Sequence, residues 1–422
     1  MTIDSSRYKG LCSCGNEHKV ETEFAIIEKD CLKNLDSYLQ MYGLGGVTAA
    51  IYDKNTYEAT YDRHPRVNYE IILDPENLHA NELGVSCLME KLPKNADVLI
   101  AIGSGTIHDI TRYSAYTRNA KFVSCPTAAS VDGFCSSVAA MTWHGCKKTL
   151  TAVAPKIVVA DTDIIKNAPM RLTRAGFGDM LGKYIALADW KIANILTGEF
   201  YCEKIANVTL NATESVLNSV DGIITGKSEA YEGLMYGLLL SGLAMQMMGN
   251  SRPASGAEHH ISHFIEMSPP AFSFTSDALH GEKVGVGTLL ALKEYKRLKN
   301  LKYPIFSSYA PQSYTKLISV FGEYMSKEIF AENENDVAMC VTKTRLCECW
   351  NNICAVIEDL PDPKHLTESY TSLNIKKSLE EIGVTSTLEK EILEHSPFVR
   401  NRLTLMRIKK CFSKRSDNNE IR

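Results

Sequence analysis

Strand-like segments that alternate with helix-length stretches limit most strongly how this chain can fold. Residues 97–103 (DVLIAIG) form a continuous apolar run that ends in glycine, which is typical of a parallel strand buried on both faces. Residues 46–53 (GVTAAIYD), 69–74 (YEIILD), 121–126 (KFVSCP) and 156–161 (KIVVAD) repeat this pattern. Because segments long enough for helices separate them, we predict βαβ units and a doubly wound parallel sheet.

The character of the chain changes near Pro169. Beyond it the apolar period is helical almost throughout, and no segment after Asp161 has a convincing strand pattern. We therefore predict an α/β domain over residues 1–168 and an all-α domain over residues 169–422. The longest apolar stretch, residues 234–249, contains glycines and is too short to span a bilayer, which predicts a buried core helix. The polar end, residues 411–422, predicts a frayed tail.

Length, charge and cysteine content narrow the class of protein. A chain of 422 residues is too long for one ordinary core, which agrees with two domains. A net charge of −4 gives no electrostatic reason to expect nucleic acid or an anionic membrane as partner. Thirteen scattered cysteines favour reduced thiols over a disulfide framework, and residues 1–10 lack the apolar segment of a signal peptide. We therefore expect a cytoplasmic protein without membrane insertion.

A glycine turn after the apolar run of residues 97–103 is the first candidate site. In GSGTIHD, Gly103 and Gly105 permit close backbone approach to a phosphate, and Thr106 or Asp109 would cap or enter the following helix. The third glycine of a full dinucleotide fingerprint is absent. A glycine turn that only joins strand to helix is the alternative.

A second loop, CPTAASVDGFCSSVAA, follows another predicted strand and is rich in small hydroxyl residues. Thr127, Ser130, Ser136 and Ser137 could hydrogen-bond a ribose, nicotinamide or phosphate. Asp132 is the lone acid among them and could hold a substrate hydroxyl. A serine-rich loop without a ligand is an equally good interpretation of these residues alone.

One aspartate and two histidines form a candidate ligand set for a divalent metal with an open coordination position. Asp179 lies in GFGDMLGKY, at or near a predicted helix start, with Lys183 four residues on and on the same face. A simple N-cap is the alternative for Asp179. His259 and His280 would complete the set. An open coordination position indicates catalysis rather than structural support.

Besides His260, three of the eleven histidines fall close together, in SRPASGAEHHISHFIE and LHGEKVGVG. His259 and His263 stand four residues apart on one predicted helical face, whereas His260 points elsewhere and is left out of the ligand set. His280 opens a new predicted helix after a break at two prolines. A single histidine is usually an ordinary core or surface residue, whereas a cluster of this kind favours a functional site.

The segment CSCGNEH offers a second, weaker metal candidate in Cys12, Cys14 and His18. The spacing is compact, but no fourth ligand lies nearby in the sequence. A structural turn is the favoured interpretation.

Five motifs in this order carry a family resemblance: GSGTIHD, PTAASVDGF, GFGDMLGKY, SRPASGAEHHISH and HGEKVGVGT. The chain resembles the sn-glycerol-1-phosphate dehydrogenases, in particular the bacterial branch. These belong to the superfamily of iron-type alcohol dehydrogenases, glycerol dehydrogenases and dehydroquinate synthases. The match covers residues 12–290 and implies a Rossmann-like dinucleotide-binding domain followed by a helical, metal- and substrate-binding domain of the dehydroquinate synthase type.

The resemblance also implies cofactors and site residues. NAD(H) or NADP(H) would bind to the two loops, through Gly103, Ser104, Gly105, Thr106, Ile107, Thr127, Ala128, Ala129, Ser130 and Ser136. One Zn²⁺ or Ni²⁺ would bind to Asp179, His259 and His280. The substrate would contact Asp132, Asp179 and His263, and the catalytic residues would be Asp179 and His263.

Two positions separate the chain from neighbouring branches of the superfamily. Iron-type alcohol dehydrogenases commonly carry a fourth ligand, a histidine, where this chain has Lys183, and dehydroquinate synthases carry glutamate where it has Asp179. The implied reaction is the reversible, metal-dependent reduction of dihydroxyacetone phosphate to sn-glycerol 1-phosphate by NAD(P)H, as part of phospholipid biosynthesis. Candidates for holding the phosphate are Lys147, Lys148, Lys183 and Arg252.

Competing functions stay open at this point. A glycerol or polyol dehydrogenase, or a synthase of the dehydroquinate synthase type, could use the same fold. A non-catalytic relative would be expected to lose a ligand or a loop glycine, and none is missing. The expected partner is a small phosphorylated triose, and a homodimer is the commonest assembly for such a chain.

Overall fold

A seven-stranded sheet is the largest regular element of the computed structural model, which describes residues 1–302 and 304–413. The strand order is β1-β4-β11-β8-β7-β5-β6, and all pairs are parallel except β1 with β4. The strands are Thr2–Asp4 (β1), Phe24–Glu28 (β4), Thr48–Asp53 (β5), Tyr69–Leu73 (β6), Val98–Gly103 (β7), Lys121–Pro126 (β8) and Ile157–Asp161 (β11). The five predicted strands are confirmed, and β1 and β4 are additions at the edge.

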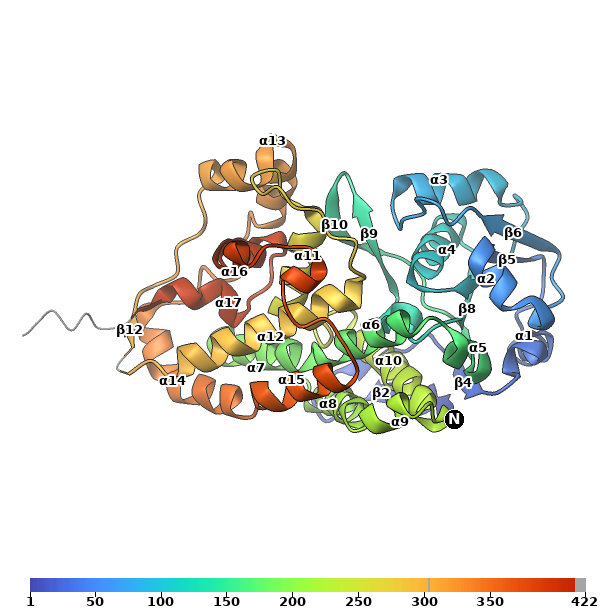
Figure 1. Ribbon diagram of the computed structural model, residues 1–422, viewed down its shortest axis with the longest axis horizontal. Coiled ribbons are helices and arrows are strands. Elements are labelled where there is room, and N and C mark those ends of the chain that lie inside the picture. Colours follow the sequence, from blue (N-terminus) through green and yellow to red (C-terminus); the bar gives the residue numbers. More distant parts are fainter. Residues whose placement is uncertain (303, 414–422) are drawn as a thin grey trace, which may run out of the picture. The chain divides into compact units, whose positions relative to one another are not determined.

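Both faces of this sheet are covered, as the uninterrupted apolar strands require. The two core clusters divide β7 between them. Val98, Ile100 and Ile102 pack with α1 (Leu35–Met41) on one face. Leu99 and Ala101 pack on the other face, with α3 (Glu82–Lys91) and α4 (Gly105–Arg118). Figure 1 shows α3 and α4 beside the strands, and the doubly wound class is confirmed.

The strand order reverses direction between β5 and β7. From β5 the chain moves outward to β6, and from β7 it moves to β8 on the opposite side. In open α/β sheets the crevice at the carboxyl ends of such strands is where ligands bind. The glycine turn that follows Gly103 lies at this point.

The β9–β10 hairpin (Val138–Trp143 and Cys146–Thr151) was not predicted from the sequence. Its two-residue loop is formed by His144 and Gly145, which have φ angles of 51° and 69°. Two successive residues with positive φ match the tight hairpin turn that fits the twist of antiparallel strands. In the sequence, the pair His144-Gly145 was the available signal for this hairpin turn.

Contacts divide the chain into two compact units, residues 1–181 with 203–254 and 372–374, and residues 182–202 with 255–371 and 375–422. The main sheet ends with β11, and α5 (Thr162–Asn167) closes just before our proposed domain boundary at residue 168. The first unit also contains α2 (Lys54–Ala59), α6 (Met170–Leu181), α8 (Glu203–Leu217), α9 (Val220–Ile224) and α10 (Ser228–Met248). An α/β domain that ends at residue 168 and is followed by an all-α domain remains a proposal.

The second unit is helix-rich. Its helices are α7 (Lys183–Thr197), α11 (Ala257–Met267), α12 (His280–Lys299), α13 (Tyr314–Glu332), α14 (Lys343–Glu358), α15 (Pro363–Ser372), α16 (Glu389–His395) and α17 (Leu405–Ile408). The expectation of no strand after Asp161 was wrong in one detail, since β12 (Ile305–Phe306) pairs with β13 (Phe412–Ser413). Two-residue strands are too short to show a period. Edge-to-face and tilted contacts among the rings of Phe306, Phe412 and Trp350 stabilise the pair. The predicted tail falls largely on residues 414–422, which lie outside the described residues.

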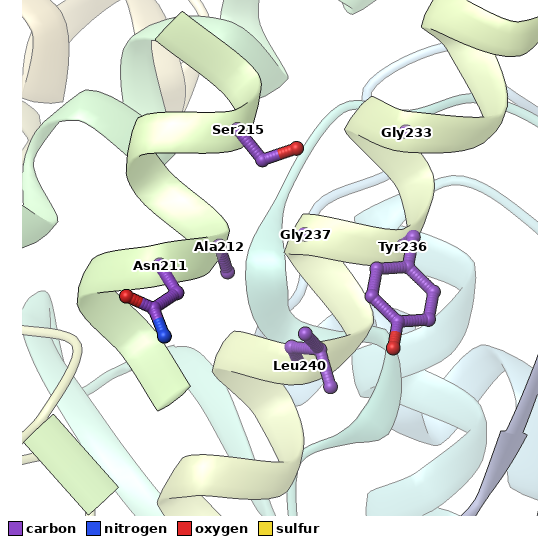
Figure 2. Close-up of a pocket in the computed structure, with 7 residues that line it drawn as sticks. All are labelled: Asn211, Ala212, Ser215, Gly233, Tyr236, Gly237 and Leu240. Atoms are coloured by element: carbon purple, nitrogen blue, oxygen red, sulfur yellow. The ribbon is translucent and has the colours of Figure 1, made fainter. Parts of the chain in front are cut away.

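The apolar stretch at residues 234–249 forms most of α10, whose side chains are largely buried, and the predicted core helix is confirmed. Among the described residues, no helix is long and apolar enough to cross a membrane. Helix α10 packs beside α8, and Figure 2 shows a small pocket between them, lined by Asn211, Ala212, Ser215, Gly233, Tyr236, Gly237 and Leu240. This lining carries no formal charge and includes none of the residues of the candidate site.

Candidate active site

The glycine turn joins β7 directly to α4. Ser104 is the N-cap residue, but its side chain makes no capping hydrogen bond. Thr106 and Asp109 lie inside the helix, so of the two alternatives for these residues, capping the helix or entering it, the structure has the second. The first N–H groups of α4 have no partner within the helix, and such a helix start is suited to bind an anion.

Gly103 has a packing reason to be glycine as well. A Cβ on Gly103 would lie 2.7 Å from the Cβ of Ile107, so a side chain at this position would force the first turn of α4 away from the strand. The absence of a side chain lets the helix begin immediately after β7. The turn thereby points its N–H groups past the carboxyl end of the sheet.

Behind the glycine turn lies His108, which the sequence analysis did not single out. Its Nδ1 is 3.0 Å from the carbonyl oxygen of Ser104, and its Nε2 is 2.9 Å from the hydroxyl of Ser124. Complete burial, reinforced by the positive charge of Arg112, lowers the pKa of His108 to about 3. A neutral imidazole therefore braces the turn against β8.

The second loop lies beside the first because β7 and β8 end in register. Gly103 pairs with Pro126, and the N–H of Thr127 donates to the carbonyl of Gly103 at 3.0 Å. The four residues Thr127, Ala128, Ala129 and Ser130 are all buried. Ser136 is also buried, and its hydroxyl accepts a hydrogen bond from the N–H of Val138 at 3.1 Å, at the start of β9.

Helix α6 is pressed against this second loop at Gly176. A Cβ on Gly176 would lie 2.0 Å from the carbonyl oxygen of Ala129. Only glycine permits such a close approach of helix and loop. The approach fixes the position of Asp179, three residues further along the same helix.

We had expected Asp179 at or near a helix start, but it lies near the end of α6. The helix begins directly after Pro169, a residue that suits a first helical turn, and it runs through both glycines of GFGDML. Lys183 is the first residue of the next helix, α7, so the expected shared face of Asp179 and Lys183 on one helix was also wrong. The simple N-cap alternative is excluded by this position.

The carboxylate of Asp179 is fully buried and meets the second loop. Its Oδ2 accepts a hydrogen bond from the backbone N–H of Asp132 at 3.0 Å. The carboxylate of Asp132 in turn accepts from the hydroxyl of Ser241, on α10, at 2.9 Å. The two predicted acids are thus brought together within the first unit, and Ser241 is a supporting residue that the sequence did not reveal.

In the second unit the three histidines converge. His259 and His263 lie on α11, and His280 is the first residue of α12, as predicted. A ring nitrogen of His259 and one of His280 lie within 4.8 Å of each other. The ring centroid of His263 lies 6.0 Å from that of His259 and 5.9 Å from that of His280.

A carboxylate stands behind each of the two predicted ligand histidines. Nδ1 of His259 is 2.7 Å from Oε1 of Glu258, and Nδ1 of His280 is 2.8 Å from Oε1 of Glu266. A carboxylate acceptor fixes the ring proton on Nδ1 and leaves Nε2 as the metal-binding nitrogen. This arrangement fits a divalent cation, and both glutamates were missed because nothing in the sequence distinguishes them from other helical glutamates.

The third histidine is buried and neutral. Burial, together with the positive charge of Arg400, holds the pKa of His263 well below its usual value. A neutral imidazole can either donate or accept a proton. Its position beside the two ligand candidates suits it to contact a substrate rather than to form an ion pair.

Of the four predicted phosphate-binding residues, two are accessible and two are buried. Lys147 and Lys148 are half-buried on β10, whereas Lys183 and Arg252 are buried. A further acid that the sequence analysis missed is Asp53, at the carboxyl end of β5 beside the switch point, where it caps α2. The strand pattern GVTAAIYD, which ends in this acid, was the available signal.

Comparisons with known proteins agree with this fold. Residues 26–169 match the family described as iron-containing alcohol dehydrogenase. The structure is similar to an iron-containing alcohol dehydrogenase from Corynebacterium glutamicum, with a TM-score of 0.60, 14% identity and coverage of 92% of this chain and 91% of that one. It is also similar to a probable glycerol dehydrogenase from Sinorhizobium meliloti, with a TM-score of 0.55, 18% identity and coverage of 89% and 96%. The chain therefore has the fold of the iron-type alcohol dehydrogenases.

More similar sequences narrow the assignment. A glycerol-1-phosphate dehydrogenase (NAD(P)+) from Bacillus licheniformis is 34% identical over 411 residues, which cover 94% of this chain and 92% of that relative. An enzyme of the same name from Pyrococcus horikoshii is 32% identical over 270 residues, 63% of this chain and 76% of that relative. The chain belongs to the glycerol-1-phosphate dehydrogenase family, as the sequence motifs predicted.

Proposed function

We propose that this protein catalyses the reversible reduction of dihydroxyacetone phosphate to sn-glycerol 1-phosphate by NAD(P)H, with one divalent metal ion. The observation that carries the proposal is near full-length similarity to enzymes with this name. The carboxylate-backed histidines and the open helix start after Gly103 support it. The proposed metal ligands are Asp179, His259 and His280, and the proposed ion is Zn²⁺ or Ni²⁺.

The chain's own groups take defined roles in this reaction. When bound, the metal polarises the substrate carbonyl and the nicotinamide supplies the hydride. The N–H groups at the start of α4 bind the cofactor's pyrophosphate, and the loop Thr127–Ser130 with Ser136 holds the rest of the dinucleotide. The four basic candidates Lys147, Lys148, Lys183 and Arg252 are proposed for the substrate phosphate.

Two acids and a histidine orient the substrate. The carboxylate of Asp132, held by Ser241, would accept a hydrogen bond from a substrate hydroxyl. His263, kept neutral by burial, would donate or pass on the proton that completes the alcohol. Asp179 would serve as ligand and as neighbour of the substrate at once.

The test uses protein stripped of metal and reloaded with Zn²⁺ or Ni²⁺. Oxidation of NADH and NADPH would be followed with dihydroxyacetone phosphate and with dihydroxyacetone, and reduction of NAD+ and NADP+ would be followed with glycerol. We expect turnover that needs both the metal and the phosphate, and a product that an sn-glycerol-3-phosphate-specific enzyme does not consume. Equal activity with dihydroxyacetone would favour a polyol dehydrogenase instead.

A matched pair of variants tests the ligand assignment. His259→Ala should abolish turnover and binding of the catalytic metal with little loss of fold, whereas His365→Ala, at an exposed histidine of α15, should change neither. Full activity of His259→Ala, with as much metal bound per chain as in the parent protein, would contradict the proposal. The predicted homodimer and cytoplasmic location stay predictions, and light scattering of the purified protein checks the first of them.

A further inference from the structure

The N-terminal segment forms a small hairpin that the proposed reaction does not use. Strands β2 (Gly10–Leu11) and β3 (Glu17–His18) pair antiparallel, and Cys12 and Cys14 lie in the loop between them. The N–H of Gly15 donates to the carbonyl of Cys12 at 2.9 Å, and Gly15 has a φ of +87°, which favours glycine. One ligand atom each of Cys12, Cys14 and His18 lies within 4.8 Å of the others. The loop therefore gathers two thiols and an imidazole.

The distance between one thiol and the imidazole matches a metal site. Sγ of Cys14 is 3.4 Å from Nε2 of His18. In a tetrahedral zinc site, with Zn–S of about 2.3 Å and Zn–N of about 2.0 Å, sulfur and nitrogen stand about 3.5 Å apart. A backbone carbonyl, that of Met247, lies 3.0 Å from Nδ1 of His18. This second bond places the ring proton on Nδ1 and directs the lone pair of Nε2 towards the thiol.

Chain topology brings a fourth ligand to the same place. Helices α8 and α10 pack side by side (Figure 2) and run antiparallel because only the short α9 joins them, so the start of α8 lies near the end of α10. Met247, which His18 contacts, is in the last turn of α10. Nζ of Lys204, in the first turn of α8, bonds to the carbonyl of Arg7 at 3.2 Å, just before the hairpin. Cys202, buried and peptide-bonded to the first residue of α8, is the thiol that this arrangement supplies.

We propose that Cys12, Cys14, His18 and Cys202 bind a structural zinc ion. Three thiolates and one neutral imidazole give a closed tetrahedral site without an open position, which is the pattern of structural rather than catalytic zinc. Binding releases the three thiol protons and involves no change of oxidation state.

The site would fasten the hairpin to the α8–α10 pair. Gln246, next to Met247, already accepts a hydrogen bond from the N–H of Glu21 at 2.8 Å and donates to the hydroxyl of Thr22 at 2.8 Å. It also donates to the carbonyl of Cys135, in the loop that contains Asp132. Loss of the ion would therefore loosen the N-terminal segment where it supports the second cofactor loop.

The experiment counts metal in the full-length chain. In the His259→Ala background, which lacks the proposed catalytic metal, the protein should still hold one zinc per chain after treatment with a mild chelator. Adding Cys14→Ser or Cys202→Ser should remove that zinc, whereas Cys340→Ser, at an exposed cysteine, should keep it. Failure of the proposed enzyme activity would leave this result unchanged.

Cobalt substitution makes the test independent of whether the serine variants fold. With Co²⁺ in place of zinc, the otherwise intact site should show the near-ultraviolet thiolate-to-cobalt charge-transfer band and the visible bands of tetrahedral coordination. His18→Cys should retain the metal with a stronger thiolate band. A His259→Ala protein that takes up neither zinc nor cobalt would overturn the proposal. An undiminished thiolate band in Cys202→Ser would overturn the assignment of Cys202 as the fourth ligand.

Discussion

Replacing Gly176 by alanine should damage both stability and activity, although alanine is the better helix former. The added Cβ would lie 2.0 Å from the carbonyl oxygen of Ala129 and 3.2 Å from the Cα of Ser130. Both are backbone atoms of the second loop, so no side chain can turn away to make room. Helix and loop must separate instead.

The size of that separation follows from the contact distance. Real Cβ contacts are essentially never shorter than 3.0 Å, so α6 must move away from the loop by about 1 Å. Overpacking of this kind costs about 1–3 kcal/mol, which exceeds the gain of about 1 kcal/mol from helix propensity. The same movement would stretch the 3.0 Å bond between the N–H of Asp132 and Asp179 beyond bonding distance. A 1 Å misplacement of this kind can lower kcat/KM by about 100-fold.

A matched substitution isolates the effect of the close approach. Gly233 lies inside α10, and a Cβ there would meet nothing within 4 Å, so Gly233→Ala should raise the free energy of unfolding by about 1 kcal/mol and leave activity unchanged. Urea unfolding and steady-state kinetics of both variants give the comparison. Equal stabilisation by Gly176→Ala and Gly233→Ala, with unchanged kcat/KM in both, would refute the reasoning.

Three further predictions follow from single contacts. Because the pKa of His108 falls from 6.5 to about 3 on folding, the unfolded chain binds a proton below pH 6.5 that the native chain does not, and stability falls as pH falls. Between pH ~6.5 and ~5, the free energy of unfolding should fall by about 2 kcal/mol less in His108→Gln than in the parent chain, as measured by urea unfolding. Glu266→Ala should weaken metal binding about 10–100-fold, measured by competition with a chromogenic chelator, because His280 loses its carboxylate partner. Asp53→Asn should raise the NADPH/NADH ratio of kcat/KM about tenfold, since a carboxylate at the end of β5 would repel a 2′-phosphate by about 1.4 kcal/mol.

The strands of the main sheet could be predicted because burial on both faces leaves a continuous apolar run. The run Val98–Ile102 has this pattern, and so do the strands on either side of it. Edge strand β1 escaped prediction because it has only three residues and pairs on one side. The helix start at His280 was predicted correctly because a loop precedes it. The start of α6 was placed wrongly because glycines lie inside that helix.

The position of Asp179 shows why glycines misled the prediction. In a sequence, glycine signals a turn because of its backbone freedom, and GFGDMLG was accordingly interpreted as a helix start. In the structure, Gly176 serves a contact instead, because its missing side chain admits Ala129. That contact joins residues 47 positions apart and leaves no local signal.

Supporting residues are hidden from sequence for a related reason. A ligand histidine stands out because histidines are few, with eleven in this chain, whereas Glu258 and Glu266 are two among many helical acids. Their role depends on an acceptor placed 2.7–2.8 Å from a ring nitrogen, which is a property of the fold. Cys202 is the extreme case, since 184 positions separate it from His18 and only the antiparallel pairing of α8 and α10 connects them. Rare residue types with short spacing can therefore be assigned from sequence, whereas the groups that orient them require the three-dimensional arrangement.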